Sequence, residues 1–273
     1  KLGGTLVYGK PEVYFWLSLF EDEAKKAKKI PSTNEPLTME QYQLRGEFAN
    51  SCLADYCMGV AKDPRVRMKE LFKANPIELT AAAPGREWMS DCRAQDENLK
   101  RFVGETVPRE HHVPVGRWQV EAPLYSPVYG LSARADAISY AADEKSATVL
   151  ELKSGKWDNF RGDRPKLEHV VQPIFYGDLL YFSRGIPRHA VNQLLCYSKT
   201  IPENQYDAEK RGRLFTRPEL ERVGPGGTIG RAMRNFADVR NRIVAMGEKV
   251  RSGAFRRVIE ACRVEDFRSA GMG

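Results

Sequence analysis

Three consecutive segments rich in β-branched and aromatic residues, spread over residues 118–153, constrain the fold of this chain most strongly. We expect them to form strands at 118–125, 128–140 and 147–153, because such residues favour an extended, half-buried backbone. The polar residues 142–145 separate the second segment from the third and predict a turn there. Consecutive strands joined this closely are expected to pair antiparallel.

Helical patterns surround these strands. Residues 231–250 carry apolar side chains at alternating intervals of four and three, which is the spacing of one helix face. The sequence also predicts helices over 38–61, 65–73, 87–103 and 167–182, and a fourth strand over 190–197. This order of elements predicts an α/β fold in which a mixed central β-sheet is flanked by helices, with an N-terminal helical region.

No shift in composition marks a domain boundary within this order of elements. We therefore expect residues 1–38 to be an N-terminal extension and residues 39–273 to be a single domain. Within that domain we expect a helical part at 39–113, an α/β core at 114–200 and a C-terminal helical part at 201–273.

The composition narrows the classes of partner. A formal net charge of +7 favours a polyanionic partner, although charge alone also serves solubility. No run of eighteen apolar residues occurs, so we expect no membrane span. Five cysteines without regular spacing are unlike a secreted disulfide framework, which favours an intracellular location. The chain starts at Lys1 rather than at a methionine, as a piece of a longer protein would.

One charged pair in the third predicted strand is a candidate for a catalytic role. Glu151 and Lys153 stand two residues apart, so their side chains project from the same face of the strand. Asp136 lies one strand upstream, and the backbone carbonyl of Leu152 lies between the paired side chains. Carboxylate and carbonyl oxygens are suitable ligands for Mg²⁺ or Mn²⁺, and a lysine can activate water or stabilise an attacked phosphate. This set predicts metal-dependent hydrolysis of phosphodiester bonds, although an isolated Glu-x-Lys on a strand is usually a solvent-facing charge pair.

The predicted helix after this strand carries further polar groups. Gln172 and Tyr176 are four residues apart and share a helix face with His169. We expect Gln172 and Tyr176 to position the substrate and Lys153. Pro173 lacks an N–H group, so we expect the helix to start or bend there.

These segments resemble a known family. Asp136, then Glu151 and Lys153, then QPIFY at 172–176 is similar to the PD-(D/E)XK nuclease superfamily of RecB type, which has a QxxxY helix. A narrower resemblance covers about residues 118–200, where the chain resembles the nuclease domain of the DNA replication ATP-dependent helicase/nuclease family. It rests on EAPLYSPVYGLSARAD at 121–136, LELKSGK at 150–156, EHVVQ at 168–172 and LLCYSKT at 194–200.

The resemblance implies a DNA nuclease acting on single-stranded flaps or tails, as the nuclease portion of a larger helicase-nuclease. It also implies a DNA partner and an attached or associated helicase. Two alternatives remain open at this point. One is a stand-alone RecB-type exonuclease of CRISPR adaptation or of a phage or mobile element, and the other is a catalytically weak DNA-binding module. Endonuclease and exonuclease cutting are both compatible with these residues.

The chain departs from the family at two places. RecB-type nucleases carry a glycine, three residues and a histidine before the strands, and here Gly46 is followed by Asn50 at the histidine position. Asn50 is a candidate metal ligand, although an amide oxygen binds Mn²⁺ more weakly than an imidazole does. The helicase/nuclease family usually holds a [4Fe–4S] cluster with four cysteines. The spacing of Cys52, Cys57 and the three later cysteines does not match that pattern, so we expect no cluster.

Five residues near the catalytic set are candidates for DNA contacts: His169, Trp157, Phe160, Lys156 and Arg134. Trp157 and Phe160 could stack on unpaired bases, and core packing is an equally good reading of at least one of them. The adjacent His111 and His112 are typical of surface residues rather than of a metal site.

Overall fold

The computed structural model describes residues 38–82, 85–127, 130–155, 165–199, 212–221 and 228–260. The chain divides into two compact units. Residues Pro36–Pro225 form one of them, and helices α10 (Thr228–Arg251) and α11 (Phe255–Glu260) belong to the other. The catalytic candidates all belong to the first unit.

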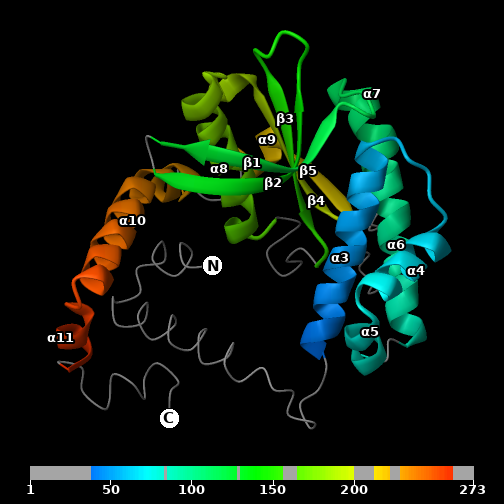
Figure 1. Cartoon of the computed structure of the whole chain (residues 1–273). Coiled ribbons are helices and arrows are strands. Elements are labelled where there is room, and N and C mark those ends of the chain that lie inside the picture. The colour runs from blue at the N-terminus through cyan, green and yellow to red at the C-terminus, as the bar shows by residue number, and fades with distance from the viewer. Residues whose placement is uncertain are drawn as a thin grey trace. The chain divides into compact units, whose positions relative to one another are not determined.

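A five-stranded mixed sheet forms the centre of the first unit (Figure 1), with the strands in the order β1-β2-β3-β4-β5. The strands are β1 (Trp118–Ser126), β2 (Leu131–Tyr140), β3 (Ala147–Lys153), β4 (Val191–Tyr197) and β5 (Arg213–Thr216). Neighbouring strands pair antiparallel except β3 and β4, which are parallel. The α/β class, the mixed sheet and the three consecutive antiparallel strands are therefore confirmed.

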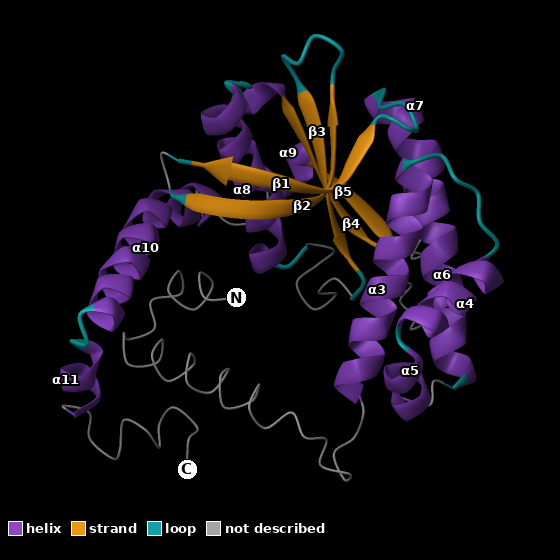
Figure 2. Ribbon diagram, in the orientation of Figure 1, coloured by secondary structure: helices purple, strands orange, loops and turns teal. Residues whose placement is uncertain are grey.

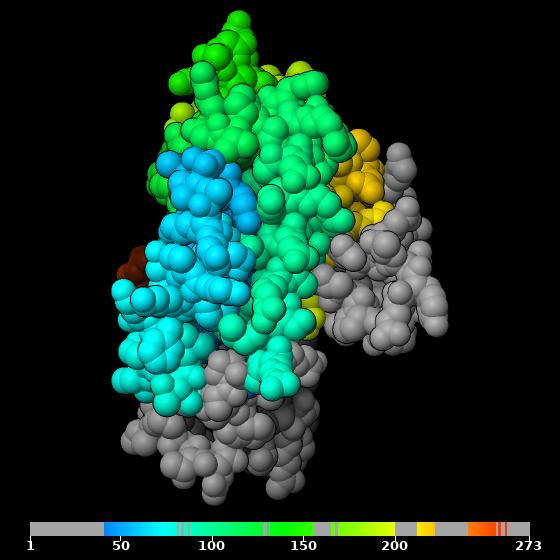
Figure 3. Space-filling view, turned by 90° about the vertical axis from the view of Figure 1, so that its right-hand side faces the viewer, coloured from blue at the N-terminus to red at the C-terminus, as the bar shows by residue number. Residues whose placement is uncertain are grey.

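Helices cover both faces of the sheet (Figure 2). On one face lie α3 (Thr38–Cys57), α4 (Pro64–Ala74), α5 (Pro76–Ala82), α6 (Arg86–Leu99), a π-helical segment (Lys100–Thr106) and α7 (Val107–His111). Figure 3 shows the outer surface of this helical layer. On the other face, α8 (Leu167–Arg184) packs against four strands, β1 to β4. Because α8 runs between β3 and β4, it is the crossover that parallel neighbours require.

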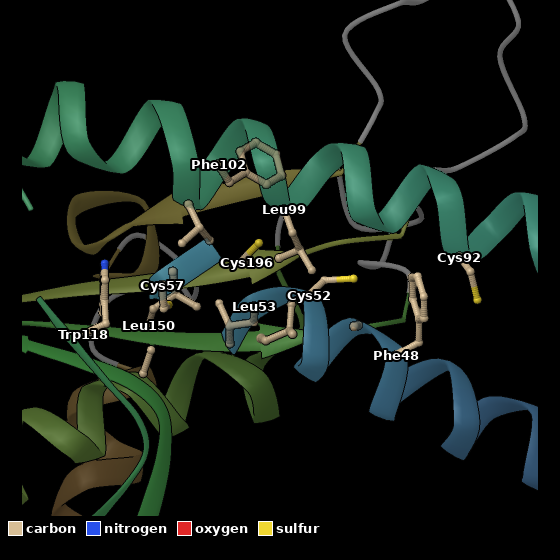
Figure 4. Close-up of a cluster of buried hydrophobic side chains, with 14 of the residues drawn as sticks. Phe48, Cys52, Leu53, Cys57, Cys92, Leu99, Phe102, Trp118, Leu150 and Cys196 are labelled. Carbon is tan, nitrogen blue, oxygen red and sulfur yellow. The ribbon is translucent and has the colours of Figure 1, made fainter. Parts of the chain in front are cut away.

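Two hydrophobic cores follow from this layering. The first joins α3, α6 and the π-helical segment to the sheet through residues such as Phe48, Leu53, Leu99 and Leu150 (Figure 4). The second lies between the sheet and α8 and contains Tyr176, Leu179, Leu180, Ile138 and Val149. Neighbours on β3 enter different cores because side chains alternate along a strand.

Helix α8 does not start at Pro173, one of the two alternatives predicted there. The helix begins at Leu167 and continues through Pro173 to Arg184, rather than starting at the proline. Four residues later, Gly177 faces β4 so closely that a Cβ there would lie 2.5 Å from Nε2 of the buried Gln193. Glycine therefore lets α8 approach the sheet at this point.

Several elements differ from the sequence-based expectation. The predicted helix over 38–61 ends at Cys57, and the one over 87–103 begins at Arg86 and passes into the π-helical segment. The short elements α5, α7, β5 and α9 (Arg217–Glu221) were not predicted, because they span only four to seven residues each. Residues 1–37 of the predicted extension at 1–38 lie outside the described residues, and Thr38 is the first residue of α3.

No helix in the described ranges is long and apolar enough to cross a membrane.

Candidate active site

The candidate site begins where the pairing of β2 with β3 ends. The last partners in this ladder are Ala137 and Leu150. Beyond them, the backbone N–H of Leu152 donates a hydrogen bond of 2.6 Å to Oδ2 of Asp136 instead of to a β2 carbonyl. In an extended strand the N–H and C=O of one residue point to the same edge, so the Leu152 carbonyl also points to the β2 edge of β3.

A distortion of the β1–β2 pair lies beside Asp136. The register pairs Val120 with Ala137 and Ala122 with Ala135, and skips Glu121 and Asp136 between them. Glu121 has a φ of 52°, in the left-handed region that a glutamate rarely adopts. On either side of this point, Ala137 packs in the first core and Ala135 in the second. The distortion therefore coincides with the position of the candidate catalytic aspartate.

Glu151 and Lys153 form the predicted pair on one face of β3. Only 3 % of Glu151 is exposed, and its Oε1 lies 2.5 Å from Nζ of Lys153. The hydroxyl of Tyr176 donates to the other oxygen, Oε2, at 2.9 Å. Both oxygens of this buried carboxylate therefore have a partner from the chain, which is what a buried charge requires. Tyr176 therefore contacts Glu151, whereas its predicted role was to position the substrate and Lys153. That role stays a prediction.

The carboxylates influence one another electrostatically. Burial, followed by the negative charge of Glu151, raises the pKa of Asp136 to about 7. Burial and Glu151 also raise the pKa of the Tyr176 phenol well above its usual range, so Tyr176 stays a hydrogen-bond donor. The negative charge of Glu151 therefore favours a proton or a cation at Asp136.

His169 lies on the lysine side of the site. Its Nδ1 is 2.7 Å from the hydroxyl of Tyr197, which also accepts a 3.3 Å hydrogen bond from the backbone N–H of Lys166. Burial, and then the positive charges of Lys153 and Lys166, lower the pKa of His169 to about 4. His169 is therefore a neutral imidazole near Lys153 at neutral pH.

The other predicted residues are spread around this centre. Gln172 is half-buried on α8, and no other described residue forms a hydrogen bond with its side chain. Arg134 is 71 % exposed in its side chain and pairs with Glu121 at 2.7 Å. Lys156, Trp157 and Phe160 lie outside the described residues. The roles proposed for Gln172, Arg134 and His169 stay predictions.

Asn50 is exposed on α3, one helical turn after Gly46. A Cβ at Gly46 would lie 3.6 Å from Oγ of Ser154, the residue after Lys153, so α3 does approach this end of β3. That distance is an ordinary van der Waals contact, so alanine would also fit. The structure gives Asn50 no hydrogen bond to Asp136 or Glu151, and its role as a metal ligand stays a prediction.

Two residues of the site were not singled out from the sequence. Tyr197 holds His169, and Glu121 adds a third carboxylate charge that raises the pKa of both Asp136 and Tyr176. Both belong to the segments that carry the family resemblance. Their position in those segments was the sequence signal that could have identified them. The spacing of Glu121 and Tyr197 from the other site residues does not indicate a site.

The donor set is compatible with Mg²⁺ or Mn²⁺. The described residues contain no group of three His, Cys, Asp or Glu side chains arranged to hold a metal. Asp136 and Glu151 supply two carboxylates, and Leu152 supplies a carbonyl on the same side. These are the hard oxygen ligands that both ions prefer, and both ions retain water in their remaining positions.

The cysteines of the described ranges are core residues. Cys52, Cys57, Cys92 and Cys196 are buried free thiols among apolar side chains (Figure 4). Burial raises the pKa of Cys57 and of Cys92 to about 12. Cys262 lies outside the described residues, and the expectation about an iron–sulfur cluster stays a prediction.

Comparison of the chain with protein-family models gives no match, and comparison with curated proteins gives none either.

Proposed function

We propose that this chain is a metal-dependent deoxyribonuclease with a RecB-type PD-(D/E)XK core. The observation that carries the proposal is the convergence of Asp136, Glu151 and Lys153 from β2 and β3 on one site, with Tyr176 of α8 holding Glu151. An isolated Glu-x-Lys pair would be expected on a solvated strand face. Here Glu151 is 3 % exposed and the side chain of Lys153 is 19 % exposed.

The residues divide the chemical work between them. Asp136, Glu151 and the Leu152 carbonyl would hold Mg²⁺ or Mn²⁺, which when bound lowers the pKa of a bound water and neutralises charge on phosphate oxygens. Lys153 supplies a positive charge beside Glu151, where it can stabilise the negative charge that develops on the phosphate. Tyr176 holds Glu151 through its hydrogen bond, and the neutral His169 would contact substrate near Lys153.

Single-stranded DNA, as a flap or a tail, is the substrate that the resemblance implies. The net charge of +7 is compatible with a polyanionic substrate. Attachment to a helicase belongs to the same proposal and rests on the family resemblance. An intracellular location also belongs to it and rests on the cysteine pattern.

A catalytically weak DNA-binding module is the second candidate, because Asn50 stands exposed where the family has a histidine. One assay separates the two candidates. Labelled single-stranded and flap DNA is incubated with wild type, Glu151→Gln and Lys153→Met, each with Mg²⁺, Mn²⁺ or EDTA. A nuclease requires cleavage by wild type with metal and a loss of cleavage in both variants, while DNA binding persists.

Two matched controls remove the same charges elsewhere. Glu105→Gln and Lys69→Met change exposed residues of the helical layer and should leave cleavage unchanged. Binding without metal-dependent cleavage by the wild type would favour the binding module.

A further inference from the structure

A concave site lies near the end of β2 and β3 that is opposite to the candidate active site. It has a volume of about 470 Å³ and is formed by the segment after α7 and by the β2–β3 turn. Its polar lining includes Arg117, His111, His112, Ser139 and Thr148. A volume of this size lies within the range of about 300–1,000 Å³ that is usual for small-molecule sites.

Ser139 and Thr148 of the pocket lie on the face of the sheet opposite to Glu151, and Tyr140 and Ala147 extend the lining around the end of β2 and β3. Ser139 pairs with Thr148, and the next pair on the same face is Ala137 with Leu150, both in the first core. Glu151 follows Leu150 and therefore projects from the opposite face. A ligand in the pocket would be separated from Glu151 by the thickness of the sheet.

Three contacts hold one wall of the pocket. Asn192 Nδ2 lies 3.2 Å from Nδ1 of His111, and Val113 is 5 % exposed in the first core. The backbone N–H of Gly116 donates to the carbonyl of Cys57 at 2.8 Å, which ties the segment to the end of α3. Arg117, the residue before β1, therefore follows an anchored loop.

The opposite wall is the turn between β2 and β3. The N–H of Ala141 donates to the Ser146 carbonyl at 3.0 Å, and the N–H of Lys145 donates to Oδ1 of Asp143 at 3.0 Å. These bonds close the turn on itself, so both walls are formed before any ligand arrives. Preformed walls reduce the entropy lost on binding.

The lining groups favour an anion. Arg117 is an exposed cation, and the serine and threonine hydroxyls can donate hydrogen bonds to phosphate oxygens. With the Asn192 amide donating to Nδ1, the neutral His111 ring carries its proton on Nε2 and remains a donor. Burial lowers the pKa of His111, so its contribution near neutral pH is this N–H rather than a charge.

Among the described residues, no aspartate or glutamate lines the pocket, and the two acidic residues of the β2–β3 turn, Asp143 and Glu144, lie outside the lining. The nearest acidic side chain of α7, Glu110, pairs with Arg109 at 2.8 Å. Two histidines without a carboxylate or a thiolate are a poor donor set for a metal, and Nδ1 of one of them is already occupied. The remaining lining is largely alanine, valine and proline, which suits the uncharged part of a ligand.

We propose that this pocket binds a small phosphate monoester of nucleotide size, with Arg117 and the histidines facing the phosphate and the apolar lining facing the rest of the ligand. This site goes beyond the proposed nuclease function and does not depend on it.

The test is titration of the full chain with adenosine 5′-monophosphate in EDTA, followed by calorimetry, with adenosine and inorganic phosphate as separate arms. We expect saturable binding of the monophosphate, weaker binding of adenosine, and competition by inorganic phosphate. Arg117→Glu should weaken binding at least about tenfold, because an arginine–phosphate contact is charge-assisted, and Arg117→Lys should weaken it less.

Arg65→Glu makes the same charge change at an exposed position of α4 and should bind like wild type. Lys153→Met should also bind like wild type, which separates this pocket from the candidate active site. Thermal melts confirm that each variant is folded. Equal binding of the monophosphate and adenosine, or wild-type affinity in Arg117→Glu, would overturn the proposal. So would the absence of saturation at about 10 mM.

Discussion

The hydroxyl of Tyr176 donates a 2.9 Å hydrogen bond to Glu151, whose other carboxylate oxygen lies 2.5 Å from Lys153. Tyr176 of α8 and Lys153 of β3 thus both contact the carboxylate of Glu151. This relationship makes the orientation of Glu151 depend on α8, and it leads to the first prediction.

Tyr176→Phe should lower the rate of DNA cleavage by about 10- to 100-fold, the usual effect of removing a group that orients a metal ligand. The phenyl ring still fills the space in the second core, so the variant should fold. Loss of the hydrogen bond leaves one oxygen of a buried carboxylate unpaired, at a cost of about 1–3 kcal/mol in the free energy of unfolding. Cleavage kinetics and urea unfolding measure the two effects. Tyr181→Phe, at an exposed position of the same helix, is the matched control.

Asp136→Asn should abolish cleavage and raise the melting temperature at pH 8. Burial and Glu151 raise the pKa of Asp136 to about 7 from an ordinary value of 3.8, so the folded protein holds this proton more tightly than the unfolded chain does. The stability linked to this proton is fully present below pH 3.8 and is lost as the pH rises through 7. The gain in melting temperature should therefore be largest at pH 8 and should shrink towards pH 4. A melting temperature for the variant below that of wild type at pH 8 would contradict this account.

The metal requirement should depend on pH for the same reason. A ligand must be deprotonated to bind a cation, so metal and proton compete for Asp136. We expect the metal concentration that gives half-maximal cleavage to rise up to about tenfold per unit as the pH falls below 7. Cleavage measured as a function of Mg²⁺ concentration at several pH values tests this. A half-maximal concentration that does not change between pH 5.5 and 8 would show that Asp136 is not a ligand.

Arg67→Met should destabilise the helical layer strongly. The side chain of Arg67 is 0 % exposed, pairs with Asp55 at 2.9 Å and also pairs with the buried Asp96. Removing the cation leaves buried negative charge without compensation, which costs about 3–5 kcal/mol. Chemical unfolding measures the difference, and Arg65→Met on the exposed side of α4 should change stability by less than about 0.5 kcal/mol.

The predicted strand over 147–153 and β3 have the same bounds, because seven residues of mostly β-branched and apolar type are bordered by turn-forming residues on both sides. Alternation along that strand also placed Glu151 and Lys153 together. Strand β5 was not predicted, because four residues are too few to show the alternation of a strand. Its pairing with β4 defines it.

The parts of the site that could not be predicted depend on tertiary contacts. The spacing of Gln172 and Tyr176 predicts that they share a helix face. It does not predict which of the two contacts Glu151, and in the described residues Tyr176 does so. The left-handed backbone of Glu121 has no sequence signal, since residues other than glycine rarely adopt it. The contact of His169 with Tyr197 joins residues 28 positions apart and arises from the packing of α8 on β4.

The initial rate of metal-dependent cleavage of labelled single-stranded DNA, compared between wild type and Glu151→Gln, tests the central claim most directly. The account predicts cleavage by wild type with Mg²⁺ or Mn²⁺, none in EDTA, and a rate at least about a hundredfold lower in the variant, because a neutral amide replaces a buried ligand charge. Equal rates for the two proteins, or cleavage by wild type that persists in EDTA, would contradict it.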